Sequence, residues 1–311
     1  MSQQGLFDLD FSQDHPKTHI IVDASNLFFR ASTAYGRLDA KDVENPVSHI
    51  FGTVKLLSTI VRKVEGGYDL HIVRDGSSSF RYKVFPDYKK TRIAKKAERK
   101  AVQEDWEKEY FRRLWSEYYQ TLRHLPTKWY REEDMEADDT IASLTHQLLE
   151  EDSTCRIWIM TSDQDLWSLI SDRVSCIALE SKFIDAASVY SKLGVSPCKV
   201  PLYKSFFGDS SDEYPGVYRL RKKVLCPLIE SSDSVEEVYE KVEGDDFVGS
   251  SREKTALLDF VDQVKINNRI ANLVVRAVDV VESHVGSESD MKSWLGTKRC
   301  PSLLKDLYLF Y

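Results

Sequence analysis

Three short apolar runs in the first half of the chain predict buried parallel strands. Each run is rich in β-branched residues and bounded by small or polar ones; they span 18–25, 68–76 and 155–163. Helix-period patterns separate them, over about 46–65, 94–124 and 137–151. Strands that alternate with helices are typical of an α/β layer with a mainly parallel sheet.

Beyond about residue 185 the strand patterns fade, and helical patterns cover roughly 196–207, 219–230, 234–243 and 251–283. We therefore expect three parts. They are an N-terminal tail (1–17), an α/β core (18–185) and a C-terminal helical region (186–311).

Composition narrows the class of protein. A chain of 311 residues with 42% apolar content can bury a sizeable core. Its sequence has no apolar run long enough to span a membrane, and its N-terminus lacks the pattern of a secretory signal. Five scattered cysteines without a C-x-x-C pair predict reduced thiols and a cytoplasmic location, and argue against a zinc site built from cysteines.

Each predicted strand ends in carboxylates. Asp23 closes the first strand, Asp75 the second, and Asp163 with Asp165 the third. Ligands of an open α/β sheet bind beyond the carboxyl ends of its strands, so we expect these acids in one crevice. A single aspartate after a strand is often an ordinary turn residue. That interpretation weakens when three strands share the feature.

Two further acidic groups join this set. Glu136, Asp138 and Asp139 stand at the start of a predicted helix, where one of them could simply be a cap. Asp209 and Asp212 follow a later helix. Buried carboxylates raise one another's pKa and protonate unless cations neutralise them. Oxygen ligands predict Mg²⁺, with Mn²⁺ as a substitute, and so many acids predict two ions, an arrangement suited to phosphodiester cleavage.

Basic residues concentrate in one segment, although the net charge of the chain is −7. Residues 81–100 hold nine Lys or Arg against two acids, interleaved with aromatic residues. Such a segment can grip phosphates and stack on bases, or it can be a solvated helix face. Lys89 and Arg92 lie close in sequence to the acidic crevice and are candidates to stabilise charge on a phosphate. The other candidates for nucleic-acid contact here are Arg81, Lys83, Tyr88, Lys90, Lys95, Lys96 and Arg99.

The order of these motifs resembles the flap endonuclease or 5′-nuclease superfamily. The motifs are IVDASN, RDGSSSFRYKVFPDYKKTR, EADD, TSDQDLWSLI and GDSSDEYPGV, and the resemblance covers roughly residues 18–230. They are most similar to the phage branch that includes the T-even phage ribonuclease H. The resemblance implies a PIN-like α/β core, a helical arch at about 93–124 and a C-terminal region with a helix-three-turn-helix motif.

The resemblance also implies roles for the candidate residues. Lys89 and Arg92 match the basic pair at the base of the arch, with Tyr88 beside them. The implied metal ligands are Asp23, Asp75, Glu136 and Asp138 nearer a first ion, Asp165, Asp209 and Asp212 nearer a second, together with Asp163 and the auxiliary Asp139.

One departure from the family concerns duplex binding. The family has a Gly-hydrophobic-Gly hairpin that binds duplex phosphates and often K⁺, whereas this chain has Gly216 and no second glycine. Loss of that glycine removes a close approach of the backbone to a phosphate and puts K⁺ binding in doubt. The side chains that can compensate are Arg219, Arg221, Lys222 and Lys223.

The N-terminal tail carries a spacing similar to short peptides that bind sliding clamps. The residues are Gln3, Leu6 and Phe7. The alternative is a disordered tail in which the pattern arises by chance.

Together with these observations, the resemblance implies a monomeric, Mg²⁺-dependent 5′→3′ exonuclease and flap endonuclease with ribonuclease H activity. It would remove RNA primers and 5′ flaps in lagging-strand replication, with a sliding clamp and a single-strand DNA-binding protein as further partners. A non-catalytic DNA-binding paralogue is one alternative, although it would be expected to lack some motif acids. A PIN-type ribonuclease for single-stranded RNA is the other, and that class usually lacks the arch and the GDSSD motif.

Overall fold

The fold is built on a mainly parallel sheet. The computed structural model describes residues 15–42, 44–76, 79–178, 182–244 and 247–311. Within them lies a seven-stranded sheet of order β6-β5-β4-β1-β2-β3-β9. The strands are β1 (Thr18–Asp23), β2 (Tyr68–Val73), β3 (Thr127–Tyr130), β4 (Arg156–Met160), β5 (Val174–Ile177), β6 (Phe183–Ile184) and β9 (Glu282–His284). Strands β1 to β5 pair in parallel and the two edge strands pair antiparallel, so the predicted α/β class is confirmed.

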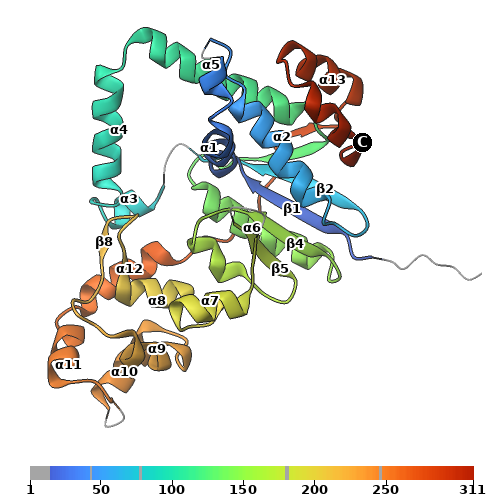
Figure 1. Cartoon of the computed structure of the whole chain (residues 1–311). Coiled ribbons are helices and arrows are strands. Elements are labelled where there is room, and N and C mark those ends of the chain that lie inside the picture. The colour runs from blue at the N-terminus through green and yellow to red at the C-terminus, as the bar shows by residue number, and fades with distance from the viewer. Residues whose placement is uncertain (1–14, 43, 77–78, 179–181, 245–246) are drawn as a thin grey trace, which may run out of the picture.

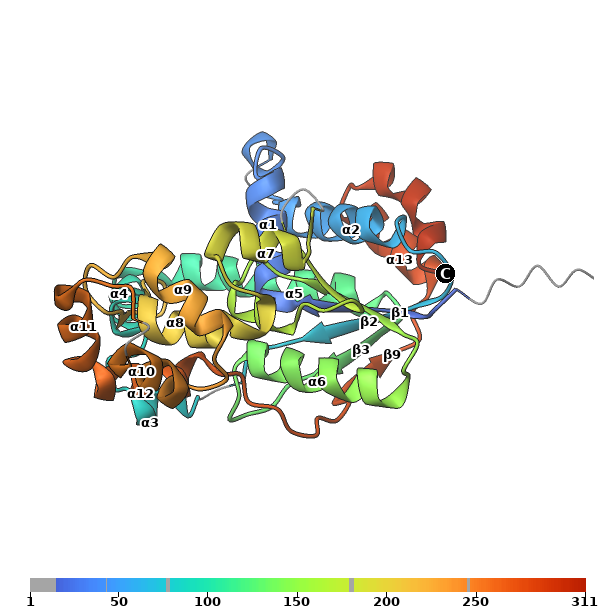
Figure 2. The same ribbon diagram turned by 90° about the horizontal axis from the view of Figure 1, so that it is seen from below.

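Helices cover both faces of this sheet, which explains why its central strands read as continuous apolar runs. Helices α1 (Ala24–Tyr35), α2 (Ser48–Val61) and part of α5 (Asp105–Arg123) pack on one face, where Ile20 and Val22 of β1 are buried. Helix α6 (Ala137–Glu151) packs on the other face, against Ile21. Figure 2 shows the sheet between these two layers.

An arch rises from the carboxyl end of the sheet. It begins with α3 (Arg81–Val84) and α4 (Lys90–Val102), and α4 stands away from the sheet before the chain turns into α5 (Figure 1). A capping box between Glu104 and Glu107 starts α5. The second half of α5 is buried at Leu114 and Tyr118. The arch expected at 93–124 therefore consists of α4 and the first half of α5, whereas the rest of α5 belongs to the core.

The C-terminal helical region follows the α/β core in the chain. Its helices are α7 (Ala186–Leu193), α8 (Val200–Phe207), α9 (Lys222–Glu230), α10 (Val235–Glu243), α11 (Ser251–Leu258) and α12 (Val261–Ala271). The irregular segment 208–221 joins α8 to α9 and contains the short paired strands β7 (Gly208–Asp209) and β8 (Tyr214–Pro215). This order of helix, turns and helix agrees with the motif that the resemblance implied. Among the described residues, none of the helices combines the length and apolar character needed to cross a membrane.

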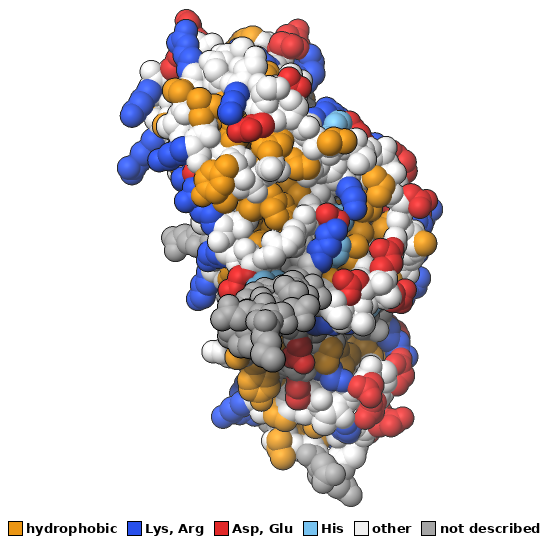
Figure 3. All heavy atoms as spheres, turned by 90° about the vertical axis from the view of Figure 1, so that its right-hand side faces the viewer, with side chains coloured by type: hydrophobic (Ala, Val, Ile, Leu, Met, Phe, Trp, Pro, Cys, Tyr) orange, Lys and Arg blue, Asp and Glu red, His pale blue; other side chains and the backbone are white. Residues whose placement is uncertain are grey.

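The last residues of the chain differ from the expected single C-terminal region of 186–311. From about residue 272 the chain returns to the core, where β9 pairs with β3. Helix α13 (Glu288–Thr297) and a 3₁₀ segment (Pro301–Leu309) then pack beside α2, on the side of the molecule that Figure 3 presents. Asp306 anchors them, because its buried carboxylate pairs with Lys55 at 3.1 Å and with Arg62.

Candidate metal centre and nucleic-acid interface

The carboxyl ends of β1 and β2 hold two of the predicted ligands in fixed positions. Asp23 is the N-cap of α1 and accepts a hydrogen bond of 2.9 Å from the Asn26 backbone. Asp75 accepts hydrogen bonds from the Ser25 hydroxyl at 3.0 Å and from the Ala137 backbone at 3.1 Å. Asp75 therefore ties the ends of β2, α1 and α6 together.

Three further carboxylates converge beside them. Asp138 lies in the first turn of α6, and Asp163 and Asp165 follow β4. One carboxylate oxygen from each of the three lies within 4.8 Å of the other two. Asp163 and Asp165 share this side because the chain already turns there, with the Asp165 backbone donating to Asp163 Oδ1 at 3.0 Å.

Burial and mutual repulsion raise the pKa of these acids. Burial, with the charges of Asp75 and Asp163 added, raises the pKa of Asp23 to about 7. Burial raises the pKa of Asp138 well above its ordinary value, and Asp163 is the next cause. Burial raises the pKa of Asp165 to about 6 despite the nearby Lys204. The ionised forms require a cation, and all the donors are oxygens, so the site fits Mg²⁺ or Mn²⁺.

A lysine that sequence analysis missed lies beside this cluster. Lys204 of α8 is buried, and its ammonium group donates to Asp209 Oδ2 at 2.6 Å and to Asp165. Burial opposes the ionisation of Asp209, but Lys204 lowers the pKa of that carboxyl overall. A lone cation in the otherwise apolar helix PLYKSFF was the available signal, because a buried lysine requires an acidic partner.

The remaining predicted acids form a second group around the foot of the arch. Lys89 Nζ lies 3.0 Å from Glu136 Oε1 and 3.5 Å from Asp212 Oδ1. The Tyr88 hydroxyl is 3.0 Å from Glu136 Oε2 and 2.8 Å from Asp212 Oδ2. Glu136 and Asp212 thus share contacts with Lys89 and Tyr88, and their expected assignment to the two ions stays a prediction. Asp165 is close to Asp138 and Asp163, whereas Glu136 is paired with protein cations.

Three predicted residues are buried in ways that conflict with their expected roles. Asp139 is fully buried, and its oxygens accept from Arg81 at 2.8 Å and from the Val274 backbone at 2.9 Å, which leaves little capacity for a metal ion. Arg81 is 3% exposed and pairs with Asp139 in a bidentate contact, so it does not offer its charge to nucleic acid. Tyr88 is 1% exposed and cannot stack on a base in this conformation.

Lys89 and the exposed Arg92 lie at the start of α4. Lys89 is the N-cap residue, with a left-handed φ of 52° that is unusual for a non-glycine residue and typical of functional sites. Glu213 accepts hydrogen bonds from the backbone of Thr91 at 2.6 Å and of Arg92 at 3.2 Å. This contact between the arch and the segment 208–216 was also missed from the sequence.

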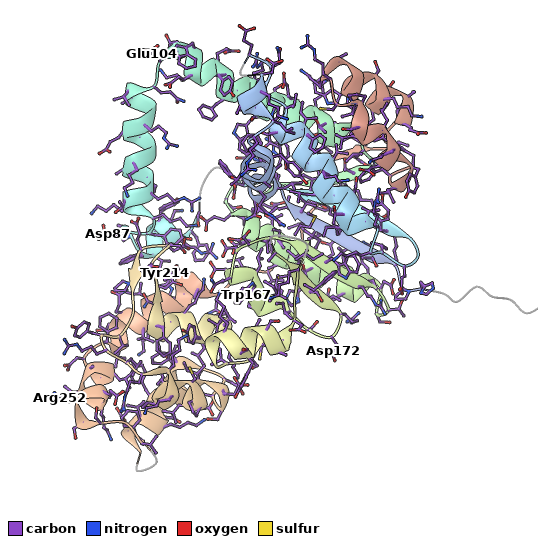
Figure 4. All side chains as sticks on the ribbon, in the orientation of Figure 1. Asp87, Glu104, Trp167, Asp172, Tyr214 and Arg252 are labelled. Carbon is purple, nitrogen blue, oxygen red and sulfur yellow. The ribbon has the colours of Figure 1, made fainter. Side chains whose placement is uncertain are left out.

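Several predicted cations face solvent along the arch and α9. Helix α4 runs from near Asp87 at its foot to Glu104 beyond its top (Figure 4). Arg219 adopts a φ of 57°, so it keeps the backbone conformation of a glycine despite its side chain. Arg221 is exposed but paired with Glu253 at 2.6 Å. The exposed candidates are Lys83, Lys90, Lys95, Arg99, Arg219, Arg221, Lys222 and Lys223.

Some expectations lie outside what the structure describes. Gln3, Leu6 and Phe7, the expected clamp-binding residues, fall outside the described residues, as does the side chain of Lys96.

The chain belongs to the 5′–3′ exonuclease family. The model for the N-terminal, resolvase-like domain of 5′–3′ exonucleases matches residues 18–194. The resemblance to the 5′-nuclease superfamily is thereby confirmed, and the chain is a nuclease, a hydrolase of phosphodiester bonds.

Curated relatives agree with this family. DNA polymerase I of Lactococcus lactis subsp. cremoris is 26% identical over 267 residues, which cover 83% of this chain and 29% of that protein. The 5′–3′ exonuclease of Buchnera aphidicola subsp. Schizaphis graminum is 25% identical over 232 residues, covering 73% of this chain and 75% of that protein. The chain thus spans less than a third of the polymerase relatives.

Solved structures share the fold. The D15 protein of phage T5, co-crystallised with metal ions, has a TM-score of 0.63 and 18% identity and covers 94% of this chain and 100% of its own. The catalytic core of Rad2 in complex with DNA has a TM-score of 0.54 and 16% identity, with 96% and 92% covered.

Proposed function

We propose that this chain is a Mg²⁺-dependent 5′→3′ exonuclease and flap endonuclease with ribonuclease H activity. It would remove RNA primers and 5′ flaps during lagging-strand replication. The observation that carries the proposal is the convergence of Asp138, Asp163 and Asp165 at the carboxyl end of the sheet, with Asp23 and Asp75 beside them.

The residues of the site divide into metal ligands and phosphate contacts. Two Mg²⁺ ions would be held by Asp23, Asp75, Asp138, Asp163 and Asp165. When bound, such ions supply an activated water and stabilise the leaving oxygen. Lys89 would donate to a non-bridging phosphate oxygen once substrate draws it from Glu136, and Arg92 would do the same from the exposed side of α4.

The surface supports a branched substrate. Exposed cations lie along α4, and Lys222 at the start of α9 lines the same surface cavity as Asp163 and Asp209, with Lys223 next to it in the chain. A single strand beside α4 and a duplex beside α9 would place the junction between them at the carboxylates. A sliding clamp and a single-strand DNA-binding protein remain proposed partners of a monomer.

The decisive experiment is cleavage of a 5′-labelled flap and of a nicked RNA–DNA hybrid. Wild type with Mg²⁺ should cut both, and either EDTA or Asp163→Asn should abolish cutting while DNA binding persists. Asp172→Asn is the matched control, because Asp172 is an exposed acid away from the cluster (Figure 4). Binding without cleavage under every divalent ion would instead favour the non-catalytic paralogue, and cutting of single-stranded RNA alone would favour the PIN-type ribonuclease.

A further inference from the structure

A second cluster of metal-ligand side chains lies in the same sheet, away from the carboxylates. His19 of β1 pairs in register with Asp69 of β2, and His71 lies two positions further along β2, so the three side chains share one face. One ligand atom from each lies within 4.8 Å of the other two. His19 precedes Asp23 by four residues along β1, a separation of about 13 Å in a strand. The two clusters are therefore distinct sites.

The spacing suits a transition-metal ion. His19 Nδ1 and His71 Nε2 are hydrogen-bonded at 3.0 Å, so an ion would take the place of the proton they share, and His19 Nδ1 lies 3.9 Å from Asp69 Oδ2. Ligand bonds of about 2.0–2.2 Å at tetrahedral angles place neighbouring ligand atoms roughly 3.3 Å apart. We propose that His19, Asp69 and His71 bind one divalent ion of the Zn²⁺ or Co²⁺ class, with water as the fourth ligand.

The surroundings of His71 orient the ring for this role. Its Nδ1 lies 3.2 Å from the Tyr130 hydroxyl, so the ring can donate its N–H there and turn the lone pair of Nε2 to the ion. An outer hydrogen bond of this kind is a regular feature of metal-bound histidine. Burial lowers the pKa of His71 to about 3 and also lowers the pKa of His19. Both rings are then neutral at pH 7, as metal binding requires.

The charges around the cluster limit which ions bind and how tightly. Asp69 also pairs with Lys17 at 2.9 Å and with Lys128 at 3.1 Å, and these ammonium groups oppose a cation while they hold the carboxylate in place. The charge of the Asp152 carboxylate has the opposite effect: it raises the pKa of His19, whereas Lys17 and Lys128 lower it. Two imidazoles among three ligands favour late transition ions over Mg²⁺, which prefers oxygen.

Asp69 is the most exposed member of the cluster. Asp69 and Lys128 line a surface cavity of about 360 Å³. His19 and His71 are buried, so an ion would have to enter past the Asp69 carboxylate.

The test is Co²⁺ binding to the whole chain with Mg²⁺ in large excess, so that the carboxylate site is already filled. Equilibrium dialysis counts bound Co²⁺, and visible absorption distinguishes low-coordinate, nitrogen-ligated Co²⁺ from the weakly absorbing, oxygen-ligated ion. We expect one equivalent with the stronger absorption in wild type, retained in Asp163→Asn. The signal should disappear in His19→Gln and in His71→Asn. His146→Gln is the matched control, since His146 is exposed on α6.

Two further variants keep the test decisive. Tyr130→Phe should weaken Co²⁺ binding by about 10–100-fold, because it removes only the outer hydrogen bond. If circular dichroism shows that His71→Asn is unfolded, Asp69→Asn takes its place beside His19→Gln. Absence of the absorption in wild type, or its persistence in the folded histidine variants, would overturn the proposal.

Discussion

Lys204 is the residue whose position most affects the chemistry of the acidic site. Its ammonium group contacts Asp165 and Asp209, and its side chain is only 8% exposed. It therefore balances part of the negative charge of Asp165 and Asp209. Asp23, Asp138 and Asp163 have no ion pair with a lysine or arginine among the described residues. A metal ion should consequently bind more tightly beside Asp23, Asp138 and Asp163 than beside Asp165 and Asp209.

Lys204→Met should make folding depend on divalent ions. Removing one partner of a buried pair leaves unpaired carboxylates and costs about 3–5 kcal/mol in the free energy of unfolding. Mg²⁺ should restore part of that loss, because it can neutralise the same oxygens. Urea unfolding with EDTA and with Mg²⁺ measures both effects. Lys292→Met is the control, since its exposed pair with Glu288 at 2.8 Å should contribute less than about 1 kcal/mol. Equal losses in the two variants would contradict the prediction.

The buried ion pair of Arg81 and Asp139 should contribute to the stability of the fold and not to DNA binding. Arg81→Met should lower the free energy of unfolding by about 3–5 kcal/mol, and adding Asp139→Leu should recover part of it, because the second change removes the unpaired buried charge. Urea unfolding of the single and double variants measures this. The neighbouring exposed Lys83→Met should change stability by less than about 0.5 kcal/mol. If Arg81→Met is as stable as wild type but binds DNA more weakly, the original prediction that Arg81 contacts nucleic acid is correct.

Single residues show where sequence analysis succeeds and where it stops. The acids at the strand ends were predictable because parallel strands bring their carboxyl ends to one edge of a sheet. The partners of Asp139, Tyr88 and Asp165 were not, because hydrogen bonds between residues far apart in the chain depend on how α3, α6 and α8 pack. Sequence spacing gave no information on those distances.

At the scale of elements, α4 is the part of the arch best placed to follow a nucleic-acid backbone. The N-terminal end of α4 is held by the contact of Lys89 with Glu136 and by the hydrogen bond from the Thr91 backbone to Glu213. Further along the helix, Lys95 and Arg99 are exposed. Phosphate contacts made from such a helix release counterions, and their number is readable from the salt dependence of binding.

Lys95→Ala and Arg99→Ala should each reduce the slope of log affinity against log salt by about 0.7 for a single strand. Fluorescence anisotropy with a flap DNA at several salt concentrations measures that slope, in an Asp163→Asn background that prevents cleavage. Lys292→Ala on α13, outside the arch, is the control. An unchanged slope in both arch variants would favour the alternative of a solvated helix face.

Elements at the end of the chain were the least predictable. Residues 251–283 suggested helix, yet the helix α12 ends at Ala271 and β9 begins at Glu282. Strand β9 has only three residues, too few to show a period, and it exists because the edge of β3 is available for pairing. The central strands were identified correctly because burial on both faces gives them long apolar runs.

For the whole molecule, the raised pKa values link stability to pH. Asp23, with a pKa raised from 3.8 to about 7, holds a proton in the folded chain that it loses in the unfolded chain. Without metal, the free energy of unfolding should therefore fall as pH rises from about 4 to about 7. Affinity for Mg²⁺ should rise over the same window, because the ion displaces that proton. Urea unfolding across this range, with EDTA and with Mg²⁺, should give opposite trends; parallel trends would contradict the assignment of Asp23 to the metal site.

The pairing of β9 with β3 also has a consequence for folding during synthesis on the ribosome. Strand β9 begins 105 residues after β5 ends, so a ribosome adding about 5–20 residues per second needs about 5–20 s to deliver it. During that interval the outer edge of β3 and the surface later covered by α13 are bare. An uncovered strand edge invites pairing with other chains. The nascent polypeptide is therefore vulnerable to aggregation until β9 has been made and has paired with β3, and chaperones would have most to protect during that interval.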